Sequence, residues 1–457
     1  MDLITPSKLI KLRKNLSLSQ SKLSEITNIK QFKISQFELN KLNLNKDEIN
    51  LLQNILKDKL LVNNILQRKK RYQKHYYTGE IIKKTHRRKY DISINNNKYT
   101  SKLKEIYKKH INQKKQFNCI SLFSGCGGFS LGASAAGFNL LGFVEINKNA
   151  RDIYKLNFNN SILLGEDIRE IDFLKTKKEI SKKIDLIIGG PPCQGFSLAG
   201  KRDVNDQRNF LYKNYLDFIK NFQPKVFMME NVELLLTMKD DKNKFIKDNI
   251  INDFKKIGYS ISFERINAAD FGVPQIRKRV IFLGIKKSLN IDISFPKKIF
   301  FPKSNNKLEK YRTFADAVSD LPFLESGENS EIDLHQAHRH PDHVIKWLWN
   351  VKEGCSAHQN IDRNLRPLSG YNTTYKRQIW DMPASTIQTT SGMISGSNNV
   401  HPICTRALTI REAARAQSFP DEFKFVGSLS GIRTVIGNAV PPLLSYEFCK
   451  FIKNYIL

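Results

Sequence analysis

The first 57 residues carry apolar side chains at intervals of three or four positions, which is the spacing of helices that bury one face. This pattern predicts four or five short helices. Ser19 precedes residues 20–23 and is placed to cap the first turn of one of them. The apolar positions are Leu9, Leu12, Leu16, Leu23, Ile26, Ile29, Ile34, Phe37, Ile49, Leu52, Ile55 and Leu56.

From about residue 116 the pattern changes to short apolar runs that alternate with helical stretches. Runs of this kind, bounded by turn or polar residues, are typical of buried parallel strands in an α/β fold. The alternation fades where Pro, Gly, Ser and His become frequent, and a helix-rich segment follows. We therefore predict an α/β domain of residues 116–295 and 405–457, interrupted by a smaller irregular domain, 296–404. The apolar runs are 119–123, 184–190, 225–231 and 279–285.

The stretch between these two parts is strongly basic, and we predict that residues 58–115 form a linker. Residues 57–116 hold 19 Lys and Arg against 4 Asp and Glu, about half of the formal net charge of +31. Tyrosines interleave with the basic runs. Two interpretations stay open: phosphate contact with aromatic stacking, or a solvated and partly helical tether.

The overall charge indicates a polyanionic partner, most simply nucleic acid. No apolar run approaches the roughly 18 residues of a membrane-spanning helix, and the N-terminus lacks the features of a signal peptide. The six cysteines are scattered along the 457 residues, which favours a reducing compartment. We expect a cytoplasmic protein that binds nucleic acid and no membrane.

A glycine-rich turn, Phe123-Ser124-Gly125-Cys126-Gly127-Gly128, separates the first apolar run from an expected helix at 129–136. Glycines let the backbone approach a ligand, and helix N–H groups then face it. Glu145 ends the next run and Asp167 follows a third, where carboxylates can bind ribose hydroxyls. The set suits an adenosine-containing cofactor. A tight structural turn and ordinary surface carboxylates are the alternative.

The sharpest motif is GGPPCQGFS at 189–197, directly after an apolar run. Two prolines stiffen the approach to Cys193, so that its thiol is displayed rather than buried. Glu230 stands at the end of the next run, and the ends of neighbouring parallel strands converge on one crevice. Arg277 and Arg279 lie two apart on an extended segment, point the same way and suit phosphate or carbonyl oxygens.

The order of these motifs resembles that of the C5-cytosine DNA methyltransferases, from about residue 118 to 457. The resemblance implies a Rossmann-like methyltransferase fold with an inserted target-recognition domain, and methyl transfer from S-adenosylmethionine to a flipped-out cytosine. The matching motifs are FSGCGG (123–128), GGPPCQGFS (189–197), ENV (230–232), QIRKR (275–279), LTIREAARAQSFPD (408–421) and GNAVPP (437–442).

The resemblance also implies roles for single residues. Cys193 is the nucleophile, Glu230 pairs with ring N3 of cytosine, and Arg277 and Arg279 hold the cytosine carbonyl and the catalytic loop. The implied cofactor residues are Phe123 on adenine, Gly125, Gly127, Gly128, Glu145 on the ribose, Asp167 on the adenine amine, Pro191, Asn438 and Val440. The implied DNA contacts are Gln194, Ser197 and Thr386, with Ile387 beside Thr386 and with Arg411 supporting the core.

Residues 1–57 resemble the helix-turn-helix domains of the Cro and phage-repressor type, with Gln20 opening the first motif helix. The glycine that often follows the glutamate of that family is absent, since Glu38 precedes Leu39. A small helical bundle for dimerisation or docking is the alternative. The residues implied to face the major groove are Gln31, Lys33 and Gln36.

We predict a sequence-specific DNA (cytosine-5-)-methyltransferase of a bacterial restriction-modification or orphan system. It would act on double-stranded DNA as a monomer, with a separate restriction endonuclease as a candidate partner and an N-terminal domain that regulates its own transcription. A tRNA cytosine methyltransferase and a DNA-binding repressor with an inactive methyltransferase fold are the alternatives.

A metal site is not predicted. The pairs His335-x-x-His338 and Cys355-x-x-His358 have zinc-like spacings. They differ from the common cysteine-pair patterns, and histidines also face DNA, so we expect no metal.

Overall fold

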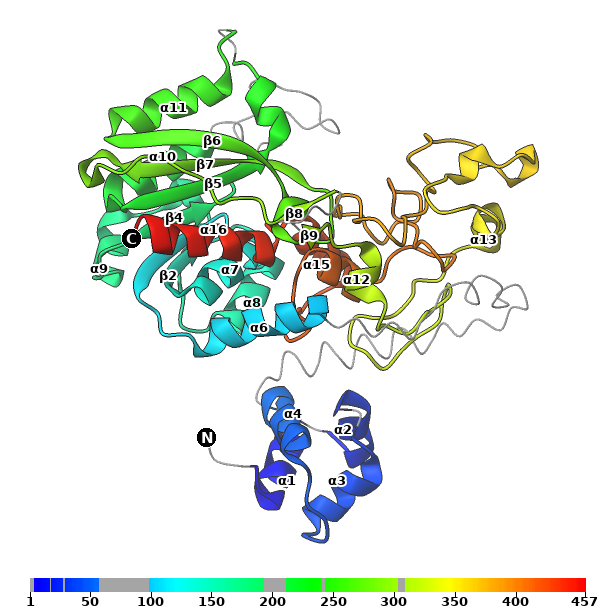
Figure 1. Ribbon diagram of the computed structural model, residues 1–457. Coiled ribbons are helices and arrows are strands. Elements are labelled where there is room, and N and C mark those ends of the chain that lie inside the picture. The colour runs from blue at the N-terminus through cyan, green and yellow to red at the C-terminus, as the bar shows by residue number, and fades with distance from the viewer. Residues whose placement is uncertain are drawn as a thin grey trace.

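The computed structural model describes residues 4–16, 18–27, 29–56, 98–192, 211–240, 243–302 and 309–457. Its centre is a seven-stranded sheet in the order β3-β2-β1-β4-β5-β7-β6 (Figure 1). The four pairs from β3 to β5 are parallel, and β7 is antiparallel to both of its neighbours. The strands are β1 (Phe117–Leu122), β2 (Phe138–Val144), β3 (Ile162–Gly165), β4 (Leu186–Gly189), β5 (Val226–Val232), β6 (Tyr259–Asn267) and β7 (Lys278–Lys286).

The direction of β7 corrects one expectation. The apolar run 279–285 is a buried strand, as predicted, but it is not parallel to the others. Residues 268–277 join it to β6 and are too short for the crossover that a parallel pair needs. The mostly parallel α/β fold is otherwise confirmed.

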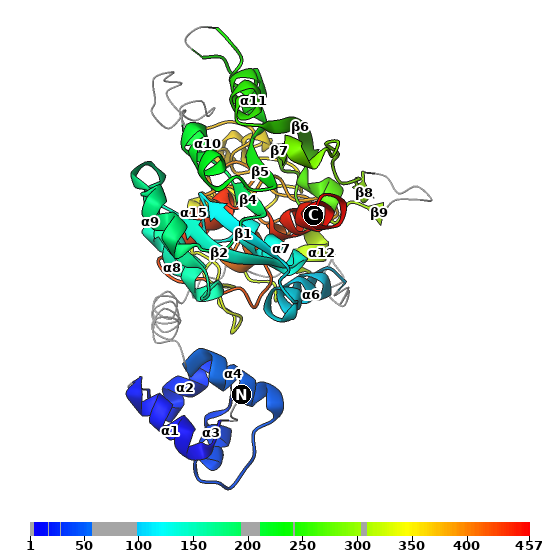
Figure 2. The same ribbon diagram turned by 90° about the vertical axis from the view of Figure 1, so that its left-hand side faces the viewer.

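Helices cover both faces of the sheet (Figure 2). Leu186 and Ile188 belong to the core under α7 and α16, whereas Ile187 belongs to the core under α10 and α11. This division follows from the alternation of side chains along a strand. The helices of this body are α6 (Lys98–Asn112), α7 (Gly128–Ala136), α8 (Lys148–Asn157), α9 (Phe173–Glu179), α10 (Leu211–Phe222), α11 (Ile246–Lys256), α14 (Ile410–Ala416), α15 (Leu429–Asn438) and α16 (Pro442–Tyr455), with short 3₁₀ turns at Ile168–Glu170, Glu233–Thr237, Ala268–Phe271 and Lys287–Leu289.

Helix α6 shows that the predicted linker extends too far toward the C-terminus. It packs on α7 and buries Tyr99, Leu103, Ile106 and His110. The Tyr99 hydroxyl donates a 2.7 Å hydrogen bond to the Arg415 carbonyl. The many lysines of this stretch hide an amphipathic helix, so residues 98–112 belong to the body. Residues 58–97 lie outside the described part of the chain.

The N-terminal residues form four described helices, in agreement with the predicted number: α1 (Pro6–Asn15), α2 (Gln20–Thr27), α3 (Gln31–Glu38) and α4 (Lys46–Leu56). Ser19 caps α2, because its hydroxyl accepts a 3.0 Å hydrogen bond from the Lys22 N–H. Glu38 accepts from Arg13 and Gln20, which ties α1 and α2 to α3. The helix-turn-helix interpretation stays a prediction.

Residues 296–404, here called the inserted region, contain little regular structure among their described residues. A buried arginine, rather than a sheet, connects its loops: Arg377 donates hydrogen bonds to the carbonyls of Leu348, His401 and Cys404 at 2.8–2.9 Å. Just beyond the region, Arg406 and Glu412 form a buried 2.7 Å ion pair. The elements of the inserted region are β8 (Phe300–Phe301), β9 (Glu309–Lys310), α12 (Phe314–Val318), α13 (Asp342–Leu348) and 3₁₀ turns at Ala357–Gln359 and Arg363–Leu365.

Across the described ranges, none of the helices combines the length and the apolar character that a membrane crossing needs.

Candidate active site

The site lies where the strand order reverses. From β1 the chain leads outward to β2 and β3 on one side, while β4 and β5 lie on the other. Ligands of open α/β sheets bind at such a point, outside the carboxyl ends of the strands. Leu122 pairs with Gly189 across β1 and β4, so the glycine-rich turn after β1 lies beside the segment Gly190–Pro192 after β4.

The glycine-rich turn leaves open space at the strand end. Gly125 has a φ of 55°, and a Cβ added to it would meet nothing within 4 Å. Its N–H donates a 2.8 Å hydrogen bond to the Glu145 carboxylate, which also accepts from the Asn147 N–H at 2.7 Å. Burial raises the pKa of Glu145, and the two N–H groups oppose that shift. Half-buried Phe123 adopts the left-handed conformation that turns the chain here.

The segment near the C-terminus closes against this turn. A Cβ on Gly128 would lie only 2.4 Å from the Val440 carbonyl oxygen, so only glycine permits this approach. Asn438 is exposed beside it. The implied cofactor residues Gly125, Glu145 and Val440 therefore gather from three distant parts of the chain.

These residues fit an adenosine-containing cofactor. The Glu145 carboxylate keeps lone pairs for ribose hydroxyls after accepting its two backbone hydrogen bonds. The open space beside Gly125 provides room for the ligand. Asp167 also has a protein partner, since its carboxylate accepts a 2.9 Å hydrogen bond from the Arg169 side chain and another from the Arg169 N–H. Arg169 lowers the pKa of Asp167.

A buried carboxylate and an arginine meet at the end of β5. Glu230 pairs with Ile281 and Val232 pairs with Arg279, so Glu230 and Arg279 are diagonal neighbours on one face of the sheet. Their side chains form an ion pair with 3.0 Å between Arg279 Nε and Glu230 Oε1. The other carboxylate oxygen faces Gly190, where an added Cβ would lie 3.3 Å from it.

Asn231 fixes the path that leads to Cys193. Its side-chain amide donates a 2.9 Å hydrogen bond to the Pro191 carbonyl, and its own oxygen accepts from the Val232 N–H. Cys193, Gln194 and Ser197 lie outside the described residues. The two residues before Cys193, however, are held next to Glu230 by Asn231. The sequence motif includes Asn231, but the motif alone did not predict this positioning contact.

Arg277 is buried and incompletely satisfied. Its Nη2 donates a 3.1 Å hydrogen bond to the Gly437 carbonyl, while Nε and Nη1 have no hydrogen-bond partner among the described residues. Burial lowers the pKa of Arg277, the charge of Arg279 lowers it further, and Glu230 opposes both. Buried donors without a partner are rare in proteins, so they indicate an acceptor supplied by a ligand or by another segment.

Hydrogen bonds join the inserted region to the segment that precedes β7 and carries Arg277. Thr386 donates a 2.8 Å hydrogen bond to the Ile276 carbonyl, and the Ile387 N–H donates to the Gln275 side chain at 2.9 Å. Gln275 in turn donates to Gln417, which donates to the Ala439 carbonyl. Gln275 and Gln417 were not singled out from the sequence. The feature of the sequence that could have identified them is a polar side chain within a motif whose residues are expected to be buried.

The remaining predicted residues have individual outcomes. Arg411 donates to the Asp333 carbonyl at 3.1 Å and to Asp421 at 3.2 Å, so it links α14 to two neighbouring segments. On α3, Gln31 is exposed, while Lys33 forms a 2.8 Å ion pair with Glu48. Phe32, for which the sequence predicted no role, is 69 % exposed beside them.

The histidines with zinc-like spacings take other partners. His335 is buried and hydrogen-bonds with Thr409 and the Pro322 carbonyl. His358 hydrogen-bonds with Thr374. Within the ranges that the structure describes, His, Cys, Asp and Glu form no group of three or more placed to bind a metal.

Comparison with known proteins identifies the family of this chain. Residues 117–454 match the model of the C-5 cytosine-specific DNA methylase family. The chain is 39 % identical over 330 residues to the Type II methyltransferase M1.HphI of Haemophilus parahaemolyticus, covering 71 % of this chain and 84 % of that protein. It is 34 % identical over 374 residues to M.DdeI of Desulfomicrobium norvegicum, covering 74 % and 89 %.

A solved structure shows the same similarity. The crystal structure of a prophage-encoded E. coli protein described as a DNA modification methyltransferase aligns with a TM-score of 0.59 at 28 % identity. The alignment covers 74 % of this chain and 99 % of that one.

Proposed function

The chain belongs to the C-5 cytosine-specific DNA methylase family and is a DNA (cytosine-5-)-methyltransferase, and we propose that it is the modification enzyme of a Type II system. It methylates one cytosine within a short sequence of double-stranded DNA and acts as a monomer, since one chain carries all the motifs. A separate endonuclease would cut the same sequence. The observation that supports this best is the Glu230–Arg279 pair, 3.0 Å apart, facing Gly190 at the approach to Cys193.

Enzymes of this family use S-adenosylmethionine, which supplies an electrophilic methyl group when bound. Glu145 would accept hydrogen bonds from the ribose, and the turn with Gly125 and Gly127 would contact the amino-acid part. Phe123 would stack on adenine. Asp167 would accept a hydrogen bond from the adenine amine and would keep the hydrogen bonds that it accepts from Arg169. The remaining candidate contacts are Gly128, Pro191, Asn438 and Val440.

Cys193 and Glu230 activate the cytosine ring. The thiolate of Cys193 adds to C6, which gives C5 the electron density to attack the methyl group. Glu230 hydrogen-bonds to ring N3 and takes up the charge that the addition places there. Loss of the C5 proton and departure of Cys193 then restore the aromatic ring. Because both faces of the ring must be reached, the cytosine has to leave the duplex stack.

The arginines position the base and the loop that carries Cys193. Arg279 would keep its bond to Glu230 and donate to the cytosine carbonyl. Arg277, two of whose buried donors lack a partner among the described residues, would bind the loop that runs from about Gln194 to Phe210 when DNA is bound. Ser197 on this loop and Thr386 opposite would contact the flipped nucleotide.

The domains that we propose follow from these roles. Residues 116–295 and 405–457, together with α6, form the catalytic domain. Residues 296–404 form the target-recognition domain. Residues 1–57 form a helix-turn-helix domain.

A second function is favoured by the N-terminal helices. Helix α3 begins four residues after α2 ends and presents Gln31 to solvent, as a recognition helix does. We infer that this domain binds an operator near the gene and regulates transcription. Footprinting of the promoter with full-length protein tests this, and a Gln31→Ala, Gln36→Ala variant that protects the same bases would contradict it.

Base-resolution cytosine-methylation sequencing tests the main proposal. A methylation-free host expresses the chain, and Cys193→Ala is the control. We expect a single short motif, methylated on C5 only by the active chain. A chain that binds S-adenosylmethionine but methylates no DNA motif would favour the RNA substrate or the inactive repressor instead.

A further inference from the structure

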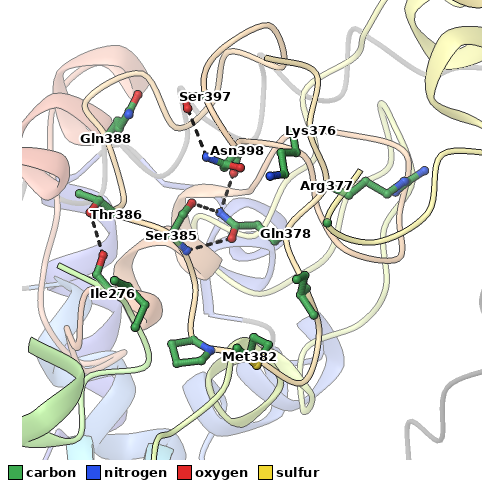
Figure 3. A pocket seen from close by; sticks show the side chains of 13 residues that line it. Ile276, Lys376, Arg377, Gln378, Met382, Ser385, Thr386, Gln388, Ser397 and Asn398 are labelled. Carbon is green, nitrogen blue, oxygen red and sulfur yellow. Dashed lines mark hydrogen bonds between the residues drawn. The ribbon is translucent and has the colours of Figure 1, made fainter. Parts of the chain in front are cut away.

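A cavity of about 490 Å³ lies where the inserted region meets the segment that carries Arg277, just before β7 (Figure 3). Ile276 and Thr386 form one side of it, and Thr386 is bonded to the Ile276 carbonyl. Ile276 precedes Arg277 directly in the chain. Thr386 is also the lining residue that the proposed function places against the flipped nucleotide, so the cavity opens next to the place assigned to the target cytosine.

Most polar atoms around the cavity already have partners. The Gln378 amide donates to Ser385 at 2.8 Å and to the Asn398 carbonyl at 2.6 Å, and its oxygen accepts from the Ser385 N–H. Figure 3 shows this cluster between Gln388 on one side and Lys376 on the other, with the Arg377 guanidinium turned away. Arg377 is committed to carbonyls of the inserted region.

Two polar side chains of the lining have no partner within the described ranges of the chain. Neither the Lys376 ammonium nor the Gln388 amide makes a hydrogen bond or ion pair with another described residue. Lys376 is half-buried and Gln388 is exposed. Both therefore offer donors to a ligand without first breaking a protein contact.

The rest of the lining fits a flat aromatic ligand attached to a polyanion. The described lining residues include the cation Lys376 but no carboxylate, so the cavity favours negative charge nearby. Ile379, Met382 and Pro383 add an apolar wall, with Met382 52 % exposed. A nucleobase in DNA combines a face that packs on such a wall with an edge that pairs with polar groups.

On the basis of the proposed function, we propose that this cavity binds the edge of a guanine next to the target cytosine and that Lys376 reads it. An ammonium has only donors, and guanine presents two adjacent acceptors, O6 and N7, in the major groove. Gln388 donates to or accepts from the same base pair. Lys376 and Gln388 are thus specificity-determining residues, whereas Gln378 and Arg377 shape the cavity.

Methylation of a randomised DNA library by purified protein tests this assignment. Wild type, Lys376→Ala and Gln388→Ala react to low conversion, and base-resolution sequencing ranks the methylated sites. We expect Lys376→Ala to lose about 10-fold to 100-fold of its guanine preference at one position beside the cytosine, with the other positions unchanged. Lys376→Arg should keep the guanine, because a guanidinium donates to the same two acceptors.

Lys346→Ala is the matched control, since Lys346 is an exposed lysine of the same region outside the cavity. Unchanged S-adenosylmethionine binding shows that each variant is folded. An equal loss of rate on all sequences with Lys376→Ala would indicate a phosphate contact and overturn the proposal. An unchanged motif would overturn it as well. If wild type itself methylates no motif, the proposed function fails instead.

Discussion

The strand-end site and the inserted region hold their side chains in different ways. Glu230 and Arg279 are fixed by seven paired positions between β5 and β7, so backbone hydrogen bonds set their register. In the inserted region Arg377 has this task, because its guanidinium gathers carbonyls that no sheet or helix satisfies. Buried carbonyls need a partner, and a loop-rich region must find it in individual side chains.

This difference teaches where chemistry and stability separate. At the strand ends a side chain can change without loss of fold, because the backbone carries the structure. In the inserted region a single polar side chain, Arg377, both holds the fold and shapes the cavity. Substitutions in the two places should therefore have opposite profiles: lost rate with retained stability at Glu230, and lost stability at Arg377.

The largest effect is expected at the strand end. Glu230→Gln keeps the shape of the side chain but removes the acid that serves ring N3, so methyl transfer should slow about 10²-fold to 10⁴-fold. Single-turnover rates with saturating DNA and cofactor measure this, and the thermal midpoint should stay near that of wild type. Glu233→Gln, on a half-exposed carboxylate just after β5, is the control. A Glu230→Gln enzyme within threefold of wild type would remove Glu230 from the chemistry.

The second effect sharpens the other side of the comparison. Arg377→Met keeps the length of the buried side chain but leaves the His401 and Ile403 carbonyls without a donor and removes further bonds to Leu348 and Cys404. The free energy of unfolding should therefore fall by at least about 3 kcal/mol. Chemical denaturation measures it. Arg363→Met, at an exposed arginine of the same region, should change stability by less than about 0.5 kcal/mol. Similar stability of the two variants would show that the inserted region does not depend on Arg377.

The same contrast explains what the sequence could predict. The runs that became β1, β4 and β5 are buried on both faces, so their apolar pattern was continuous and clear. Strand β6 lies at the sheet edge with a mixed burial pattern and was missed. The direction of β7 depended on its connection, which the apolar pattern does not contain.

The site divides in the same way. Glu230, Arg277 and Arg279 stand at ends of apolar runs, where local sequence locates them. Gln275 and Gln417 act through partners far away in the chain, and their hydrogen bonds exist only after folding. For the same reason, the sequence alone does not separate Lys376 and Gln388, which have no partner among the described residues, from the polar side chains that hold the inserted region together.

The smallest expected effect concerns single helices, and it tests whether the two regions also differ in how their helices are capped. Asp172 caps α9 in the sheet domain by accepting from Leu174 and Lys175 N–H groups, and Thr313 caps α12 in the inserted region by accepting from Asp316. A capping side chain takes the place of water as the acceptor for N–H groups that have no partner within the helix. Because this change is local, alanine at either position should lower the free energy of unfolding by about 1 kcal/mol. Denaturation of both variants compares them. Equal costs mean that the two regions differ only in what fixes their tertiary positions; a much larger cost for Thr313→Ala would mean that the short helices of the inserted region also depend on single polar groups.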